Sequence, residues 1–228
     1  MRTAIVGISA LVCLAATACG SEPAQERPYF KGAEPAGTST ATDPGYEPPF
    51  EAREYPAGPY GTRPGAVIEN LKFSGWKKPA EVEWATEAFE PIQLADFYDP
   101  DGTKGNRYIM LNASAVWCSA CRSEYTSFKN EGTYAQYRAR GVEFLCVILE
   151  DNSNPPKPSK PADLQTWGKW FDVEFPMLLD PGAKMGAYYG ANAFPMNMLI
   201  DAKTMTIVGE FGGNMPAMFI QLEQLLNQ

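Results

Sequence analysis

Residues 108–121 read Tyr-Ile-Met-Leu-Asn-Ala-Ser-Ala-Val-Trp-Cys-Ser-Ala-Cys, an apolar run that leads into two cysteines. The runs from Tyr108 to Leu111 and from Val142 to Leu149 are rich in strand-forming residues and predict buried central strands. Between them, residues 118–140 have helical spacing and end at Gly141, which suits a helix C-terminus. A strand, a helix and a strand of these lengths predict a βαβ unit with a parallel pair of strands.

The rest of the chain predicts further elements around this unit. These are helices at residues 162–171, 182–189 and from about 214 to the C-terminus, and strands at 196–200 and 206–211. The two strands flank a turn at residues 201–204 and predict an antiparallel hairpin. The expected fold class is α/β: a mixed β-sheet flanked by α-helices on both faces, in one domain over residues 65–228. No role is assigned to residues 65–88.

The chemistry is expected where the first central strand meets its helix. Trp117-Cys118-Ser119-Ala120-Cys121 places two thiols one turn apart at a helix N-terminus. Unpaired backbone N–H groups and the helix dipole stabilise a thiolate on Cys118 there, whereas Cys121 lies in the first turn and is less exposed. In redox exchange, the first thiolate attacks a foreign disulfide and the second resolves the mixed disulfide that forms.

Two other interpretations of this C-x-x-C spacing are a zinc site and a structural disulfide. A zinc site needs two further ligands, and the domain offers only Cys146 and no histidine. Redox exchange is therefore favoured, with no metal and no other cofactor. Cys146 itself lies in the apolar run VEFLCVIL and is expected to be a buried, inert thiol. Trp167 and Trp170, at helical spacing, are expected in the core.

With these residues in view, the sequence resembles the thioredoxin superfamily, and more closely its TlpA-like extracytoplasmic thiol–disulfide oxidoreductases. The resemblance runs from about Phe89 to Leu226. The resemblance rests on the motif N-x-S-A-V-W-C-S-A-C from Asn112, the acid Glu124, and the motif F-P-M-N-M-L-I-D from Phe194. It implies a thioredoxin-like mixed sheet flanked by helices, with an N-terminal extension. It also implies a redoxin-domain lipoprotein whose partners are protein thiol or disulfide substrates and a thiol electron donor.

The resemblance further implies the roles of the catalytic residues. Cys118 matches the attacking cysteine and Cys121 the resolving one, so that the two form the redox-active disulfide. Thioredoxins proper carry a buried aspartate six residues before the first cysteine, but here that residue is Asn112, which cannot titrate. Glu124 matches the acid that the TlpA-like branch uses instead. The alternative for Glu124 is a solvated helix carboxylate.

Three further residues match the substrate-binding edge of the family. Pro195 matches the cis-proline that faces the cysteines, and it leaves the backbone of Phe194 placed to pair with an extended substrate. The alternative is a plain loop proline. Trp117 packs beside the thiols in the family and shields them.

Composition excludes several other classes of function. The chain has 19 basic and 27 acidic residues, for a formal net charge of −8, which argues against a nucleic-acid binder. It contains no histidine, and this excludes Ser-His-Asp and Cys-His catalysis as well as His-ligated metals.

The N-terminus predicts export and a lipid anchor. Arg2 precedes an uncharged segment, residues 3–18, which is shorter than the roughly 20 residues that a membrane span needs. Small residues then lead into Cys19, so residues 1–18 resemble a bacterial lipoprotein signal peptide whose cleavage leaves Cys19 for lipidation. An ordinary secretory signal is the alternative. The expected location is extracytoplasmic, lipid-anchored to a bacterial membrane on the periplasmic side. Gly20 favours the outer membrane if the source is Gram-negative.

Residues 19–64 are rich in proline and glycine and predict a lipid-attached linker. The aromatic residues between Tyr55 and Pro64 allow that part to lie against the domain. Anchoring would place the domain in a compartment where disulfides persist.

Two rival functions remain. A peroxiredoxin-like thiol peroxidase has its active cysteine after a proline and after a Thr or Ser three residues before it. Here Ala115 stands at that position, and no proline lies between Tyr108 and Cys118. A non-catalytic lipoprotein binding module would keep the cysteine pair as a permanent structural disulfide. The sequence favours disulfide exchange with protein substrates.

Overall fold

The computed structural model describes residues 53–81, 89–188, 194–213 and 215–228. Its strands are β1 (Lys72–Trp76), β2 (Glu90–Gln93), β3 (Tyr108–Ala115), β4 (Val142–Glu150), β5 (Met177–Leu179), β6 (Met196–Asp201) and β7 (Thr206–Gly212). Its α-helices are α1 (Ser119–Glu131), α2 (Thr133–Arg138), α3 (Pro161–Phe171) and α4 (Met215–Leu226). Short 3-10 helices are η2 (Pro79–Glu81), η4 (Leu94–Asp96) and η5 (Lys184–Ala187).

The described strands form one mixed sheet in the order β2-β1-β5-β4-β3-β6-β7. β3, β4 and β5 run parallel, and every other neighbouring pair is antiparallel. α1 and α2 connect β3 to β4, and α3 connects β4 to β5, so the predicted βαβ unit is confirmed and a second one follows it. The predicted hairpin is confirmed as β6 and β7, whose turn is held by Asp201 Oδ1 accepting from the backbone N–H of Lys203 at 2.7 Å.

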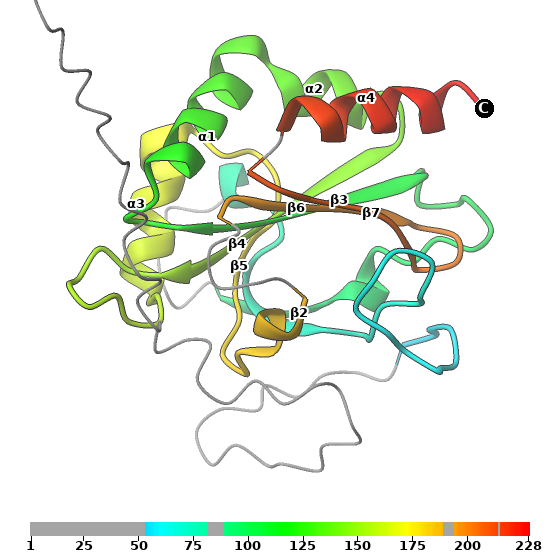
Figure 1. Cartoon of the computed structure of the whole chain (residues 1–228), viewed down its shortest axis with the longest axis horizontal. Coiled ribbons are helices and arrows are strands. Elements are labelled where there is room, and N and C mark those ends of the chain that lie inside the picture. Colours follow the sequence, from blue (N-terminus) through cyan, green and yellow to red (C-terminus); the bar gives the residue numbers. More distant parts are fainter. Residues whose placement is uncertain (1–52, 82–88, 189–193, 214) are drawn as a thin grey trace, which may run out of the picture.

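The two faces of the sheet bury separate cores. Alternate residues of the central strands point to opposite sides, as the period of two in a strand requires. On one side they pack against apolar residues of α1, α3 and α4, and Figure 1 shows α1, α2 and α4 lying over this face. On the other side they pack against Ile68, Leu71, η4 and η5. The mixed sheet flanked by helices is as predicted, but the described part of the second face carries only 3-10 helices.

The expected helix over residues 118–140 is divided into α1 and α2. Gly132 has a φ of 61° and ends α1, because its left-handed conformation stops the helical hydrogen-bond pattern. Gly141, at a φ of 86°, then leads into β4 as expected. The helix expected over 182–189 is reduced to η5 in the described residues, and residues 189–193 lie outside them.

The segment without an assigned role, residues 65–88, contributes a strand to the sheet. β1 lies between β2 and β5, and its Gly75 sits opposite Leu178. A Cβ atom at Gly75 would lie 1.9 Å from the backbone oxygen of Met177. Glycine is therefore required here, because the two backbones approach too closely for any side chain.

The described end of the predicted linker packs on the domain. The hydroxyl of Tyr55 donates to the backbone oxygen of Ile68 at 2.9 Å, and Arg63 forms an ion pair with Glu210 at 3.2 Å. Residues 1–18, Cys19 and the linker as far as residue 52 lie outside the described residues, so the signal peptide and the lipid anchor stay predictions. The domain boundary between residues 64 and 65 also stays a prediction. Within the part of the chain that is described, no helix has both the length and the apolar character to cross a membrane.

Candidate active site

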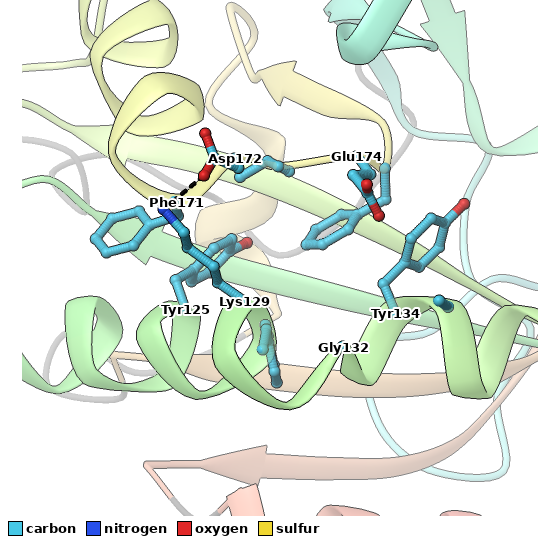
Figure 2. A pocket seen from close by; sticks show the side chains of 11 residues that line it. Tyr125, Lys129, Gly132, Tyr134, Phe171, Asp172 and Glu174 are labelled. Carbon is cyan, nitrogen blue, oxygen red and sulfur yellow. Dashed lines mark ion pairs between the residues drawn. The ribbon is translucent and has the colours of Figure 1, made fainter.

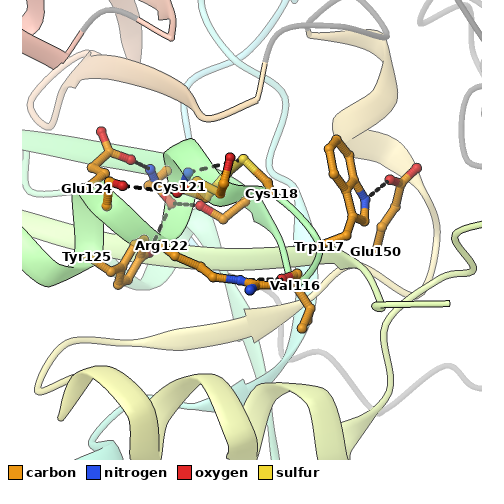
Figure 3. Close-up of a disulfide and its surroundings, with 12 residues drawn as sticks. Val116, Trp117, Cys118, Cys121, Arg122, Glu124, Tyr125 and Glu150 are labelled. Carbon is orange, nitrogen blue, oxygen red and sulfur yellow. Dashed lines mark hydrogen bonds between the residues drawn. A yellow bond between two sulfur atoms is a disulfide. The ribbon is translucent and has the colours of Figure 1, made fainter.

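The cysteine pair lies where β3 ends and α1 begins. Cys118 is the N-cap of α1, and its Sγ accepts a hydrogen bond from the backbone N–H of Cys121 at 3.1 Å. The two residues form a disulfide, with their Cα atoms 5.3 Å apart (Figure 3). Cys118 is 4% exposed and Cys121 is fully buried, as expected for an outer and an inner cysteine. Because this N–H group and the positive end of the helix face Cys118, they favour its thiolate once the disulfide is reduced.

Glu124 lies one turn beyond Cys121 and is buried, with 4% of its surface exposed. Its interpretation as a solvated helix carboxylate is therefore wrong. Burial raises the pKa of Glu124 to about 7, and hydrogen bonds from Asn197 and then Asn112 act in the opposite direction. A carboxyl group with this pKa can accept and return a proton near neutral pH, which is what a thiol–disulfide site requires.

A network of buried polar side chains surrounds Glu124. The side-chain amide of Asn112 donates to Oε2 of Glu124 at 2.9 Å, and the amide of Asn197 donates to Oε1 at 2.6 Å. Asn112 in turn accepts from the hydroxyls of Ser114 at 2.7 Å and Tyr125 at 2.9 Å. Asn112 thus orients the acid rather than titrating itself.

Trp117 directly precedes Cys118, and both Trp117 and Phe194 pack against the buried cluster that contains the two cysteines. The rings of Trp117 and Phe194 meet edge to face, with centroids 5.9 Å apart, and the Phe194–Pro195 peptide bond is cis. The indole N–H of Trp117 donates to Oε2 of Glu150 at 2.6 Å (Figure 3). The structure therefore brings Trp117 and Phe194 into contact. The substrate-binding role expected for Trp117, Phe194 and Pro195 stays a prediction.

Three residues at this site were missed by the sequence analysis. Asn197 and Glu150 are polar residues in mostly apolar strands, and that interruption is a signal that could have identified them, although it also marks Glu143 and Asp201. Arg122, on α1, donates through Nε to the backbone oxygen of Val116 at 2.9 Å and so fixes the loop before the cysteines. Its position in the sequence gives no comparable signal.

Two other predictions concern residues near the site. Cys146 is fully buried, and burial raises the pKa of its thiol to about 12, which agrees with an inert thiol. Trp167 is buried as expected, but the expectation for Trp170 is wrong. Its side chain is 48% exposed and lies under the guanidinium of Arg122, 5.7 Å from the ring centroid.

A pocket of about 230 Å³ lies between α1, α2 and the end of α3 (Figure 2). Aromatic side chains, among them Tyr125, Tyr134 and Phe171, line it. Lys129 and Asp172, which also line it, form an ion pair with each other. It contains neither cysteine. Its link to the site is Tyr125, whose hydroxyl binds Asn112.

This fold and this disulfide together define a thioredoxin-like protein with a redox-type cysteine pair. A sequence model of the AhpC/TSA family matches residues 77–210, and the chain belongs to this family. The thiol-disulfide oxidoreductase ResA of Bacillus thuringiensis subsp. konkukian is 28% identical over 137 residues, which cover 60% of this chain and 68% of that protein.

Solved structures show the same fold. A Chlorobium tepidum protein, described as a candidate thiol:disulfide interchange protein DsbE, superposes with a TM-score of 0.52 at 22% identity and covers 73% of this chain and 97% of its own. A candidate protein disulfide isomerase from Bacteroides thetaiotaomicron gives 0.52 at 20% identity, over 74% and 90% of the two chains. The predicted relationship and fold are confirmed, and the chain is a thiol–disulfide oxidoreductase.

Proposed function

We propose that this oxidoreductase is a lipid-anchored, extracytoplasmic enzyme that exchanges disulfides with protein substrates through Cys118 and Cys121. The observation that carries the exchange reaction is the Cys118–Cys121 disulfide at the N-terminus of α1, one turn from the buried acid Glu124. The location and the anchor rest on the uncharged N-terminal segment that ends at Cys19.

In the reducing direction, the Cys118 thiolate attacks one sulfur of a substrate disulfide. A mixed disulfide forms, and the second substrate sulfur leaves as a thiolate. Cys121 then loses its proton to Glu124 and attacks Sγ of Cys118, which releases the first substrate sulfur. The substrate disulfide has become two thiols, and the enzyme has become oxidised. A dithiol donor returns the enzyme to its reduced state by the reverse sequence of steps.

Protein substrates are proposed because the edge beside the cysteines is apolar and aromatic. Trp117, the neighbour of Cys118, contacts Phe194, and both rings pack against the buried cluster that contains the two cysteines. Large apolar contacts of this kind suit a polypeptide better than a small disulfide. The Phe194–Pro195 segment precedes β6 directly, so it is held by the sheet. An extended peptide can pair along such a segment through its backbone.

The decisive experiment traps the mixed disulfide in cells that produce the full-length protein and export it to its native compartment. Cys121→Ser removes the resolving thiol, so Cys118 should accumulate protein adducts that disappear on reduction. Cys118→Ser is the matched control and should trap few, because the fully buried Cys121 is the poorer nucleophile. Mass spectrometry of the adducts identifies the substrates.

Two results would overturn the proposal. Rapid consumption of peroxide by the unmodified protein, with no protein adduct on Cys121→Ser, would favour the thiol peroxidase. A native disulfide that resists mild thiol reductants, again with no adduct, would favour the structural disulfide of a binding module.

A further inference from the structure

We infer that Asn197 is a positioning residue for the exchange reaction, which together with Asn112 holds the Glu124 carboxylate in place to serve Cys121. The inference rests on the proposed function, because it assigns a residue to the proton-transfer step of the same site. Asn197 lies on β6, far in the sequence from α1 and from the cysteines.

The two asparagines are placed by the pairing of their strands. Asn112 on β3 and Asn197 on β6 sit directly opposite each other in the antiparallel ladder, and both side chains are fully buried. The amide of Asn112 also donates to Oδ1 of Asn197 at 2.8 Å. Each asparagine thereby fixes the orientation of the other, and both present an N–H group to Glu124.

Glu124 receives one donor on each of its oxygens. Asn112 binds Oε2 at 2.9 Å and Asn197 binds Oε1 at 2.6 Å. Two amide donors directed at the two oxygens match a carboxylate, whereas a protonated acid would direct its own O–H toward a donor. A buried pair of asparagines is costly in a strand unless its hydrogen bonds are made, and here Glu124 supplies the acceptors.

The amide groups of Asn112 and Asn197 are the main groups that stabilise the ionised form of Glu124. In the disulfide form, the titratable groups coupled to Glu124 among the described residues are Tyr125, from its own helix, and Cys146, from β4. In the mixed disulfide the free Cys121 thiol, which gives its proton to Glu124, is added to them. The pKa of Tyr125 is raised well above its usual value and that of Cys146 is about 12, so both are neutral near pH 7. The hydrogen bonds from Asn197 and Asn112 lower the pKa of Glu124 against the effect of burial.

The resolving step can be isolated with an aromatic disulfide, dithiobis(nitrobenzoate). Reduced enzyme attacks it through Cys118, releases one nitrothiobenzoate and keeps the other in a mixed disulfide. Cys121 then attacks Sγ of Cys118, passes its proton to Glu124, and releases the second nitrothiobenzoate as a coloured thiolate. The rate of this second release, followed by stopped flow from pH 5 to 9, gives a midpoint that we expect near 7 in the unmodified protein.

The variants should move this midpoint in a defined order. Asn197→Leu removes one donor and should raise the midpoint by about one pH unit. Asn197→Asp places a second carboxyl group against Glu124 and should raise it further. Asn106→Leu is the matched control: Asn106 is a buried asparagine before β3 whose amide donates to the backbone oxygen of Phe97 and not to Glu124. It should leave the midpoint unchanged.

An unchanged midpoint in both Asn197 variants would overturn the inference. An equal shift in Asn106→Leu would also overturn it, because the shift would then reflect a general loss of packing in the fold. If Asn197→Leu does not accumulate as folded protein, Asn197→Ser provides a smaller replacement, for which a shift in the same direction is expected. Glu124→Gln separates the two levels of proposal. Loss of the transition in Glu124→Gln with no shift at Asn197 rejects only the role of Asn197. An unchanged transition in Glu124→Gln rejects the role of Glu124 itself.

Discussion

The indole N–H of Trp117 donates to the Glu150 carboxylate at 2.6 Å, and this contact joins the residue before Cys118 to the last residue of β4. Glu150 is almost fully buried, with 1% of its surface exposed. The Trp117 ring also contacts Phe194 edge to face. We therefore expect the orientation of Trp117 at the proposed substrate edge to depend on this buried carboxylate.

Glu150→Leu removes the acceptor for the indole N–H, and we expect it to slow exchange with a protein disulfide by about tenfold, the value of one charged hydrogen bond. Reduction of a small aromatic disulfide should change less than twofold, because it does not need the Trp117 and Phe194 surface. Measuring kcat/KM for both substrates tests this. Glu150→Gln is the matched control, since its amide oxygen still accepts the hydrogen bond from the indole. An equal loss of kcat/KM with both substrates in Glu150→Leu would show a general defect of the enzyme instead.

Glu124 makes stability depend on pH. Its pKa is about 7 in the folded protein and about 4.5 in the unfolded chain, so folding disfavours its charged form. The folded state should be most stable below pH 4.5 with respect to this group. The free energy of unfolding should fall by about 3 kcal/mol as the pH rises to 7, and it should change little at higher pH. In Glu124→Gln this loss should be absent.

The measurement is urea unfolding of the oxidised protein at intervals from pH 4 to 8.5. Glu131→Gln, an exposed carboxylate on the same helix, is the control and should follow the unmodified protein. If the free energy of unfolding depends on pH in the same way in the unmodified protein and in Glu124→Gln, the raised pKa of Glu124 is contradicted.

Gly75→Ala should destabilise the fold by about 3 kcal/mol or more, since its Cβ would overlap the backbone of β5, which cannot yield as a side chain can. Gly182→Ala is the control. Its Cβ would meet only the flexible side chain of Lys184 at 3.4 Å, so a change within about 0.5 kcal/mol is expected. Comparable unfolding midpoints in urea for the two variants would contradict the close approach of β1 and β5.

The elements that the sequence predicts well are those encoded locally. The apolar runs that became β3 and β4, and the helical spacing between them, identify the βαβ unit and place the cysteines at its turn. β1 is different, because Lys72–Trp76 is short and its assignment depends on pairing with β2 and β5. Such non-local pairing has no signal within the segment itself.

The same distinction applies to the site. Cys118, Cys121 and Glu124 follow one another at intervals of three residues, about one helical turn each, so their spacing predicts that they lie along one side of the helix. Asn197 reaches Glu124 only through the register of β6 against β3, and Glu150 reaches Trp117 only through the position of β4. Trp170 has core-like spacing, but its side of α3 is left partly open and covered by Arg122. Registers and open faces are properties of the assembled sheet.

The last prediction concerns the anchor. Cys19 should carry covalent lipid, because small residues precede it at the end of an uncharged segment. A single acyl chain binds membranes only marginally, whereas several chains on one modified cysteine hold firmly. Growth with a labelled fatty acid should therefore label the unmodified protein and Cys13→Ser, whose cysteine lies within the predicted signal peptide, but not Cys19→Ser. The labelled forms should sediment with membranes. Label on Cys19→Ser, or none on the unmodified protein, would show that attachment does not occur through Cys19.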